Sequence, residues 1–512
     1  MSKQLLPIDA VTPGRLGLNL QQKGAILDPS WAITANNCVL DDSRRLAARK
    51  GYSVTTTTDI TSTPDVEAIY EYLLGDGTVE PIVSWNGGIG NSLSDPEGND
   101  VSGSVTDTDG RWWFQNFNNK LLGFQHGQKP IVYTGSTFAT VTESSGTAPT
   151  SHNGIGLSAY GRVWGLDSDG QTVKYSGLLD EADWGSASAG QIDMSNIWTE
   201  GMDEVTAIGA FNGSLLVFGN NHIVIWEDNI GSQLGLNPTQ IVVVDVIGGT
   251  GCSSQHTLQL IGETDLLFLS RNGLQSLGRV IQEKSNPINN VSKYVRDDLL
   301  ADVENEDTQN LRTMFSPEEG YYVLSIPSGK KSYVFDVRNR FQDEEGDVIF
   351  PCTIWDLYPT ALEVRQDGAI LLGAAGQVWT YGADSDDGSL IRYKYSSPWM
   401  DLGEELSNRL KMLKRIGAIL FVRNNAGVEF KWSTDFQEND KSISKVIVDP
   451  AASEWSIAEW GLGEWSGGLF LQIFKVPARD TGQYYRVKIE TSVTGQFALQ
   501  QLELFTKIGR IA

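Results

Sequence analysis

Cysteine is scarce in this sequence. Three occur in 512 residues, at Cys38, Cys252 and Cys352, and no two of them form a C-x-x-C pair. Three cysteines so far apart exclude a disulfide framework, which needs several pairs. We therefore expect three buried free thiols, as in a protein that is made in a reducing compartment.

Basic residues are outnumbered. The chain has 39 Lys and Arg against 64 Asp and Glu, which gives a net charge of −25 at pH 7. Firm binding to nucleic acid or to anionic lipid needs basic patches, so this balance opposes both. It does not oppose a channel through which DNA passes without being held.

Long apolar runs are also lacking. No stretch approaches the ~20 apolar residues that span a bilayer. The opening sequence, MSKQLLPIDAVTPGR, has no apolar core of the kind that a signal peptide carries. We therefore expect a soluble protein that is synthesised in a cytoplasm and has no membrane segment.

Motifs for catalysis and cofactor binding are missing as well. The sequence has neither G-x-S-x-G nor the phosphate loop G-x-x-x-x-G-K-[ST], and no histidine has a second ligand at metal spacing. We expect each histidine to be a surface or turn residue. The four histidines are His126, His152, His222 and His256. The sequence therefore predicts no catalytic residue, no cofactor and no metal site.

Acidic clusters are the feature that an enzyme would most readily use. Asp343-Glu344-Glu345 and Asp384 to Asp387 are prominent examples, and we expect both to be solvated loops of an acidic protein. A propeller glycosidase would use two carboxylates in a central pocket and often has Ser-x-Asp-x-Gly-x-Thr-Trp turns. The nearest stretch, Asp167 to Thr172, breaks that spacing. A propeller glycosidase is therefore kept only as an alternative.

Glycine and tryptophan are plentiful, with 54 and 15 copies against 6 methionines. Together with the scarcity of long runs of Ala, Leu, Glu and Lys, this favours turns and strands over helices. The stretch Phe211 to Asp228, FNGSLLVFGNNHIVIWED, holds two short apolar runs joined by a Gly-Asn-Asn turn and preceded by an Asn-Gly turn. This pattern predicts a β-meander.

Variants of this meander recur at intervals of 42 to 56 residues. A period of about 50 residues matches a four-stranded propeller blade better than a helical repeat. We count seven units, although the first is weak and the third is poorly matched, so six to eight blades fit the pattern. The apolar pairs that mark the units are Leu73-Leu74, Leu121-Leu122, Val163-Trp164, Leu215-Leu216, Leu266-Leu267, Tyr322-Val323 and Leu371-Leu372. The sequence therefore predicts an all-β chain with a β-propeller, against the alternative of unrelated β-sandwiches in a row.

The sequence patterns divide the chain into three regions. Residues 1–63 predict an N-terminal arm, a short helix that starts at Asp28, and a hairpin that could complete a blade. Residues 64–388 carry the repeats and predict the propeller. Residues 389–512 have strand patterns without the repeat, so they predict a C-terminal β-sandwich or platform.

One helix is expected inside the propeller region. Four apolar residues fall four apart and mark one helical stripe, with Asn289 or Asn290 placed to cap it. The stripe consists of Val291, Val295, Leu299 and Val303. Such a helix either packs on the propeller face or contacts a neighbouring subunit.

A tryptophan-rich loop lies in the C-terminal region. Trp455, Trp460 and Trp465 each follow a glutamate in SEWSIAEWGLGEWSGG, five residues apart. Three tryptophans are costly to leave in water, and tryptophan is enriched at protein interfaces. They either fold back on their own sandwich or form a contact between subunits.

Several short motifs follow one another in an order that resembles a known family. They include Gly17-Leu18-Asn19, Asp28 to Ala32, Asn36 to Val39 and Arg49 to Tyr52, then NPINNVSKYV, EEGYYVLSIP, YVFDV, SPWMDLG, the tryptophan-rich loop and QLELFTKIGR. The family is the tail nozzle proteins of short-tailed bacteriophages, also called packaged-DNA-stabilisation or tail hub proteins. The resemblance touches most of the chain and implies a propeller-bearing protomer in a ring, usually sixfold. It implies a place below the portal and adaptor, where the ring extends and gates the DNA exit channel.

The sequence thus leads us to expect a structural protein of the virion tail that retains packaged DNA and conducts it during ejection. The resemblance implies as partners further copies of the chain, six in all, together with the portal adaptor and tail fibres. We expect contacts from the arm, at Leu18, Asn19 and Leu20, and from the tryptophan-rich loop. The alternatives are a propeller that binds a host receptor or adapts tail fibres, and the glycosidase.

Overall fold

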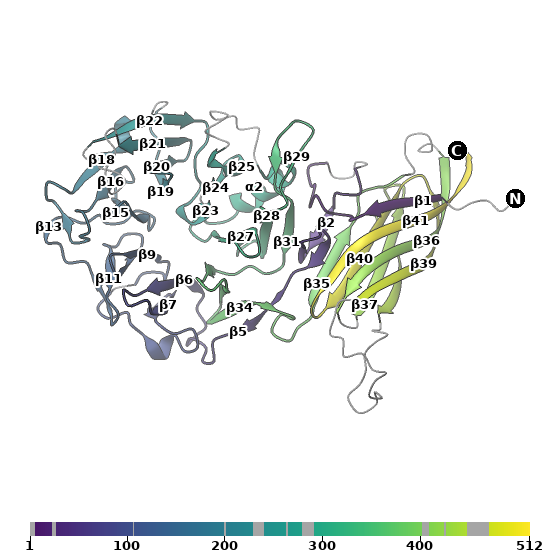
Figure 1. Cartoon of the computed structure of the whole chain (residues 1–512), viewed down its shortest axis with the longest axis horizontal. Coiled ribbons are helices and arrows are strands. Elements are labelled where there is room, and N and C mark those ends of the chain that lie inside the picture. Colours follow the sequence, from purple (N-terminus) through teal and green to yellow (C-terminus); the bar gives the residue numbers. More distant parts are fainter. Residues whose placement is uncertain are drawn as a thin grey trace.

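The computed structural model describes residues 6–22, 27–105, 107–198, 201–228, 240–262, 265–278, 291–401, 409–423, 426–447 and 470–511. The chain is built almost wholly from β-strands, which form a ring of small sheets beside a pair of large sheets (Figure 1). The prediction of an all-β chain with a propeller and a C-terminal β-sandwich is confirmed.

The ring consists of seven blades. Blade 1 contains β6 (Val66–Leu73), β7 (Val79–Trp85) and β8 (Gly88–Gly90); blade 2 contains β9 (Trp113–Phe117), β10 (Lys120–Phe124), β11 (Ile131–Tyr133) and β12 (Phe138–Thr140). Blade 3 contains β14 (Gly156–Ala159), β15 (Arg162–Leu166), β16 (Thr172–Tyr175) and β18 (Gly190–Asp193); blade 4 contains β19 (Val205–Phe211), β20 (Ser214–Gly219), β21 (His222–Asp228) and β22 (Ile241–Gly248). Blade 5 contains β23 (Gln259–Ile261), β24 (Asp265–Ser270) and β25 (Gly273–Ser276); blade 6 contains β26 (Arg312–Ser316), β27 (Tyr321–Ile326), β28 (Lys331–Asp336) and β31 (Cys352–Trp355). Blade 7 contains β32 (Ala361–Val364), β33 (Ile370–Ala374), β34 (Gln377–Ala383) and β5 (Gly51–Val54).

Contacts between the first strands of neighbouring blades close the ring. β6 contacts β9, β9 contacts β14 and β14 contacts β19, while β23 contacts β26, β26 contacts β32 and β32 returns to β6. Blades 4 and 5 join through a shared cluster that includes Phe218 and Phe268, whose rings lie 5.3 Å apart. Each blade thus buries its faces against two neighbours, which is how small sheets gain a core in a propeller.

The repeat pairs mark equivalent places in six of the seven blades. In blades 2 to 7 each pair lies on the second strand, and in blade 4 it follows Ser214, the first residue of β20. The first pair is out of register, because Leu73 ends the first strand of blade 1 and is 39% exposed. Ile82 and Val83, both fully buried on β7, hold the equivalent place.

Tight turns of the expected chemistry connect the blade strands. Asn212 and Gly213 join β19 to β20 with φ angles of 51° and 86°. Two consecutive positive φ values define the hairpin turn that matches the strand twist, and Asn-Gly is the pair that adopts it most readily. The meander predicted for Phe211 to Asp228 is therefore the centre of blade 4.

The C-terminal region is a sandwich of two large sheets. One sheet has the order β26-β27-β28-β31-β2-β35-β40-β37-β38, with β2 (Thr34–Asn36), β35 (Ile391–Ser396), β40 (Tyr485–Val493), β37 (Ala426–Thr434) and β38 (Lys441–Ile447). The other has the order β3-β4-β41-β36-β39, with β3 (Cys38–Leu40), β4 (Leu46–Ala48), β41 (Phe497–Ile511), β36 (Arg409–Val422) and β39 (Phe470–Gly482), and β1 (Leu6–Val11) pairs with β41. Along β40 the alternate residues Tyr485, Val487 and Ile489 are fully buried, so the period of two sets the core face.

Blade 6 and the sandwich share one sheet. β31 of the blade pairs with β2, and β2 pairs with β35 of the sandwich. A single hydrophobic cluster also continues from Tyr322 and Phe335 in the blade to Val428 and Leu499 in the sandwich. The two regions are therefore joined by a sheet and a core, and not by a flexible linker.

Residues 1–63 do not form a unit of their own. β1, β3 and β4 belong to the sandwich, β2 belongs to the joint, and β5 supplies the outer strand of blade 7 by pairing with β34. The N-terminal segment thus completes a blade, through β5 alone and not through a hairpin.

The helix expected at Asp28 is absent. The Asp28 carboxylate accepts a hydrogen bond from the backbone N–H of Ser30 at 2.7 Å, which makes a local turn. The chain then runs extended beside the arm, where Leu18 and Ala32 form a parallel bridge. The backbone N–H of Ala32 donates to Gly17 at 2.9 Å, so it is engaged outside any helix.

The second expected helix is present but begins later. α2 spans Arg296–Glu304 and follows a single 3-10 turn, η4 (Lys293–Val295). The predicted stripe does face the core, since its first three members are buried and Val303 packs against the same cluster. The proposed caps, Asn289 and Asn290, lie outside the described residues.

Short elements lie in the connections between blades and between strands of one blade. They are β13 (Ser145–Gly146), β17 (Asp183–Trp184), β29 (Phe341–Gln342), β30 (Val348–Ile349), η1 (Glu97–Asn99), η2 (Met194–Asn196) and η3 (Gln255–Thr257).

Candidate functional site

The arm residues that we expected to contact a partner lie in this chain's own core. Leu18 and Asn19 are 2% and 1% exposed, and Leu20 packs against the core cluster. The backbone N–H of Leu18 donates to Cys352 at 2.9 Å, and that of Leu20 donates to Tyr294 at 2.8 Å. Their positions are explained without a second protein, so a partner contact by the arm stays a prediction.

The tryptophan-rich loop lies outside the described residues. Trp455, Trp460 and Trp465 fall in the interval 448–469, between the end of β38 and the start of β39. Their predicted role in assembly stays a prediction.

Strand β22 presents an exposed apolar surface on the propeller rim. It is the outer strand of blade 4, and Val242, Val243 and Val244 are 43%, 40% and 53% exposed. Neighbouring residues of a strand point to opposite faces, so both faces of this edge are apolar. Glu227 and Asp245 flank the valines, on β21 and on β22 itself. Among the described strands none pairs with the outer edge of β22, and an exposed apolar edge of this kind indicates a protein contact.

Strand β39 presents a second apolar surface, on the sandwich. β39 ends the six-stranded sheet, and its outward residues Leu471 and Ile473 are 50% and 58% exposed. Lys475 and Arg479 continue the same outward row and are also exposed. This surface is therefore apolar at one end and basic at the other.

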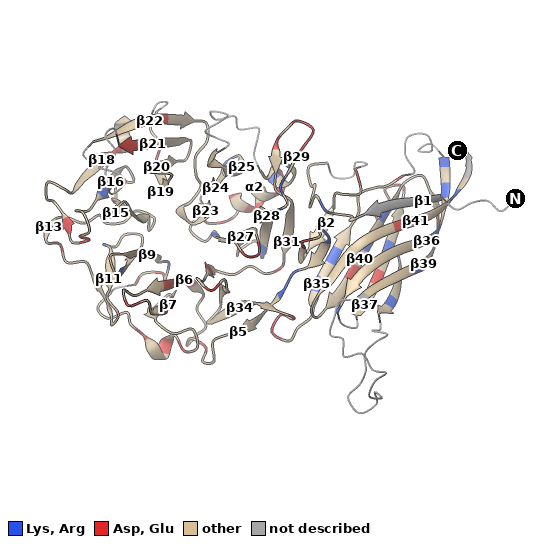
Figure 2. Cartoon of the chain, in the orientation of Figure 1, with Lys and Arg blue, Asp and Glu red and all other residues tan. Residues whose placement is uncertain are grey.

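The two parts of the molecule also differ in charge. Residues 1–388 contain 23 basic and 50 acidic residues, whereas residues 389–512 contain 16 basic and 14 acidic ones. Blue segments accordingly stand out on the sandwich strands in Figure 2, and red marks β21 beside β22. The acidity of the chain thus resides in the propeller and the N-terminal segment.

A cavity of about 370 Å³ lies at the centre of the propeller. The inner strands of blades 1, 2, 6 and 7 line it, together with η3 and β23 of blade 5. Trp112, Trp113 and Phe114 supply bulky walls, while Glu67 and Glu363 supply carboxyl groups. The centre of the propeller is therefore a small, partly polar chamber.

The two carboxyl groups of this chamber have different surroundings. Glu67 lies beside Arg312, whose Nε donates to the Glu67 carbonyl at 3.2 Å and whose Nη2 is 3.5 Å from Glu67 Oε2. Burial raises the pKa of Glu363 to about 8, an effect that a backbone N–H of Glu71 only partly offsets. Burial also lowers the pKa of Arg312 to about 10 and the pKa of His256 well below its usual value. Near pH 7 the chamber thus holds a protonated carboxyl and a neutral imidazole.

Two of the histidines, which we expected at the surface or in turns, are buried: His222 begins β21 directly after the β20–β21 turn, and His256 lies in η3. His222 and His256 are 5% and 7% exposed. Nδ1 of His222 lies 2.9 Å from Asp203 Oδ2, and Asp203 also accepts the backbone N–H groups of Asn220 and Asn221, so this pair fixes the β20–β21 turn. The hydrophobic pattern of the sequence predicts where the strands lie. It does not predict that the turn between β20 and β21 holds a buried pair of histidine and aspartate.

The other two histidines lie near each other. The rings of His126 and His152 are 5.5 Å apart, and His152 Nε2 is 2.8 Å from Glu204 Oε1. Sequence spacing gave no sign of this proximity, because the residues sit in connections of neighbouring blades.

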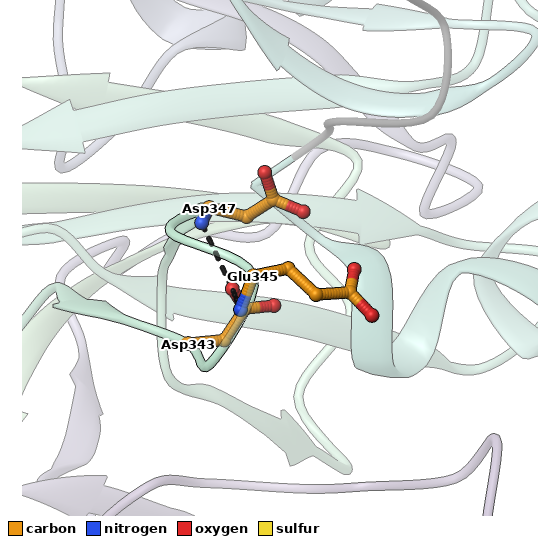
Figure 3. A group of neighbouring side chains, drawn as sticks. All are labelled: Asp343, Glu345 and Asp347. Carbon is orange, nitrogen blue, oxygen red and sulfur yellow. Dashed lines mark hydrogen bonds between the residues drawn. The ribbon is translucent and has the colours of Figure 1, made fainter.

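The acidic loop before β30 is organised, and not simply solvated as we expected. Ligand atoms of Asp343, Glu345 and Asp347 lie within 4.8 Å of one another (Figure 3), and the Asp343 and Asp347 side chains are 5% and 4% exposed. Nζ of Lys293 donates to these three carboxylates at 2.8, 2.5 and 3.1 Å. Burial disfavours the charged amine, but the carboxylates outweigh it and raise the pKa of Lys293. A built-in ammonium group thus occupies the place where a metal ion would bind.

The three cysteines are buried and unpaired, as predicted. Burial raises the pKa of Cys252 to about 11 and also raises the pKa of Cys38 and Cys352. The thiolate is the reactive form, so these groups are inert near neutral pH.

Comparisons with known proteins do not assign the chain to a family. No family model matches the chain, and no curated protein matches it. Among the described residues no helix is long and apolar enough to cross a membrane.

Solved structures with a similar arrangement are propellers of unrelated kinds. The computationally designed Ika8 protein is 11% identical, with a TM-score of 0.36 over 65% of this chain and 99% of its own. The WD40 β-propeller domain of Doa1 is 12% identical, with a TM-score of 0.34 over 65% and 97%. The extracellular domain of BT4673 from B. thetaiotaomicron, a putative one component system, is 10% identical, with a TM-score of 0.40 over 86% and 62%. At these scores the likeness carries no argument, and the propeller assignment rests on the strand pairing.

Proposed function

We propose that the protein is a structural subunit of a ring that forms the distal nozzle of a short phage tail. In this role it retains packaged DNA and conducts it during ejection. The ordered motifs of the sequence support the family, and two features of the molecule support the ring.

The observation that carries the proposal is the pair of different apolar surfaces at β22 and β39. They lie on separate parts of the molecule, since blades 5 and 6 intervene between blade 4 and the sandwich. Acidic residues flank one surface and basic residues flank the other, so the two are complementary in charge. A contact between two different patches repeats head to tail and closes into a ring when the rotation allows.

The joint between propeller and sandwich supports a role in a stiff wall. A subunit that opens and closes on a ligand needs a hinge, whereas this chain shares a sheet and a core across the joint. A tube that holds DNA under pressure needs subunits that do not bend.

The path of the DNA would lie between subunits and not through a propeller. The central chamber has a volume of about 370 Å³ and is walled by aromatic side chains, which leaves no room for a duplex. A ring of acidic propellers around the channel would repel the phosphate backbone and let it slide.

Electron microscopy of the purified protein mixed with a portal–adaptor complex tests the proposal. Density on the tail axis that continues the channel is the expected result. Peripheral density would favour the alternative role, a receptor-binding or fibre-adaptor module, and would overturn the nozzle.

A further inference from the structure

We propose that a pocket beside the propeller centre binds a short neutral oligosaccharide. The pocket has a volume of about 600 Å³, within the range of ligand sites. It lies where β5 and β34 of blade 7 meet the connection from blade 6 and the start of blade 1. This function is separate from ring formation, because the pocket contains no residue of β22 or β39.

Aromatic side chains give the pocket a surface that suits sugar rings. The rings of Tyr52 and Trp379 stack with centroids 4.1 Å apart and an interplanar angle of 12°. Tyr358 also lines the pocket and is 41% exposed. Aromatic side chains combine an apolar body with a polar handle, so they can cover the C–H face of a sugar while polar neighbours bind its hydroxyl groups.

The charges of the pocket favour a neutral ligand. Arg49 is held by Asp386 through two hydrogen bonds of 2.7 and 2.8 Å, and Arg111 lies 3.3 Å from Asp307. The basic side chains of the lining are thus already paired, while Asp65 and Asp356 add further carboxylates to it. Phosphates, sialic acids and uronic acids would meet an excess of negative charge. Carboxylates instead accept hydrogen bonds from hydroxyl groups, of which a neutral sugar has many.

The pocket adjoins the central chamber. Glu67 lines both, and two pairs of consecutive residues divide between them, Arg111 with Trp112 and Thr360 with Ala361. Together the spaces are large enough for two or more sugar units. A chain end that enters the chamber would meet Glu67 and Gln259 as hydrogen-bonding partners.

Isothermal titration calorimetry of the intact protein tests the site with defined probes. The probes are malto-, cello- and N-acetylchito-oligosaccharides of four to six units, with sialyllactose as the anionic probe. We expect at least one neutral probe to bind, and sialyllactose to bind at least about tenfold more weakly.

Variants place the binding in the pocket. Tyr358→Ala and Asp65→Asn should each weaken binding about tenfold or more with an unchanged melting temperature. Phe436→Ala removes an aromatic side chain that is 50% exposed outside the pocket, so it should leave binding unchanged. The site is overturned if no neutral probe binds at millimolar concentration, if sialyllactose binds best, or if Tyr358→Ala binds as well as Phe436→Ala. Ring formation by Tyr358→Ala should equal that of the unaltered chain, so failure of this proposal leaves the nozzle intact.

Discussion

The strands of the propeller and those of the sandwich differ in length and in how far apart in the sequence paired strands lie. Among the described blade strands none exceeds eight residues, and most pair with the next strand along the chain. In the sandwich β41 has 15 residues and pairs with β36, and β1 pairs with β41 from the other end of the sequence. The propeller is therefore a sum of local hairpins, whereas the sandwich is held by contacts between distant segments. Because the two regions share β2 and one core, the propeller and the sandwich should unfold together.

The largest effect on stability should come from truncating a side chain in the shared core. Leu18→Ala removes a side chain that is 2% exposed at the joint, and should lower the free energy of unfolding by about 2–5 kcal/mol. Leu390→Ala is the matched control, since Leu390 is 53% exposed. Urea unfolding followed by fluorescence and by circular dichroism should shift as one transition. Two transitions, of which one keeps its midpoint, would mean that the two regions fold independently.

A smaller change in stability, which depends on pH, should distinguish a buried acid of the propeller from a surface acid of the sandwich. The raised pKa of Glu363 means that the folded state holds its proton up to about pH 8, while the unfolded chain loses it near pH 4.5. The stability that this group contributes is thus present below pH 4.5 and is lost as the pH rises to 8. Glu363→Gln should therefore be more stable than the unaltered chain at pH 8, by roughly 1–3 kcal/mol.

The control for that variant lies in the sandwich. Glu490 pairs with Lys431 at 2.8 Å on a partly exposed surface, and such pairs contribute little. Glu490→Gln should change stability by less than about 1 kcal/mol at any pH between 5 and 9. Thermal melts at several pH values measure both. Parallel pH profiles for Glu363→Gln and the unaltered chain would contradict the burial argument.

Substitution of two glycines by alanine compares the stability of a propeller turn with that of a sandwich strand. Gly213 has φ of 86° and open space where a Cβ would lie, so Gly213→Ala should cost about 1–2 kcal/mol through backbone strain alone. Gly427 lies in β37, also with open space, and its φ is not in the left-handed region. Gly427→Ala should be neutral or should stabilise by up to about 1 kcal/mol. Chemical denaturation of the two variants provides the measurement, and equal values would show that turn geometry does not govern blade stability.

The substitutions with the smallest effect on stability should have the largest effect on assembly. Val243→Lys and Ile473→Lys each change an exposed residue, so each should alter the free energy of unfolding by less than about 0.5 kcal/mol. Both should abolish the ring, because each places a charge in one half of the proposed contact. Val446→Lys is the control, since Val446 is 71% exposed on β38, outside both surfaces. Mass photometry with portal–adaptor complex reports the ring, and intact rings in both variants would contradict the proposed contact.

The sequence revealed the parts of the fold that depend on neighbours in the chain. Six apolar pairs mark second strands, and Asn212-Gly213 makes its turn, because these features need only local residues. The joint was not predictable, since β2 has three residues and is defined by its pairing with distant strands. The stripe in α2 was found, but its start was placed too early because Val291 is buried without being helical.

The candidate sites were still harder to predict. The central chamber and the sugar pocket draw residues from several blades, so no stretch of sequence contains either of them. Val242 to Val244 look like an ordinary buried strand, and their exposure depends on β22 being the outer strand of its blade. Leu18 and Asn19 are expected to contact a partner because they belong to a motif that resembles the family's, and their burial within this chain leaves that contact a prediction.

The outer strand of blade 7 sets the order in which the molecule can be completed during synthesis. β5 emerges from the ribosome long before its partner β34, which ends at Ala383, more than three hundred residues later. Until then the growing blades form an open arc with two uncovered apolar faces, of the kind that aggregate. The ring and the sheet that leads into the sandwich are therefore finished almost at the same moment, once β34 and β35 have both been made, and β5 pairs only after the other blades exist.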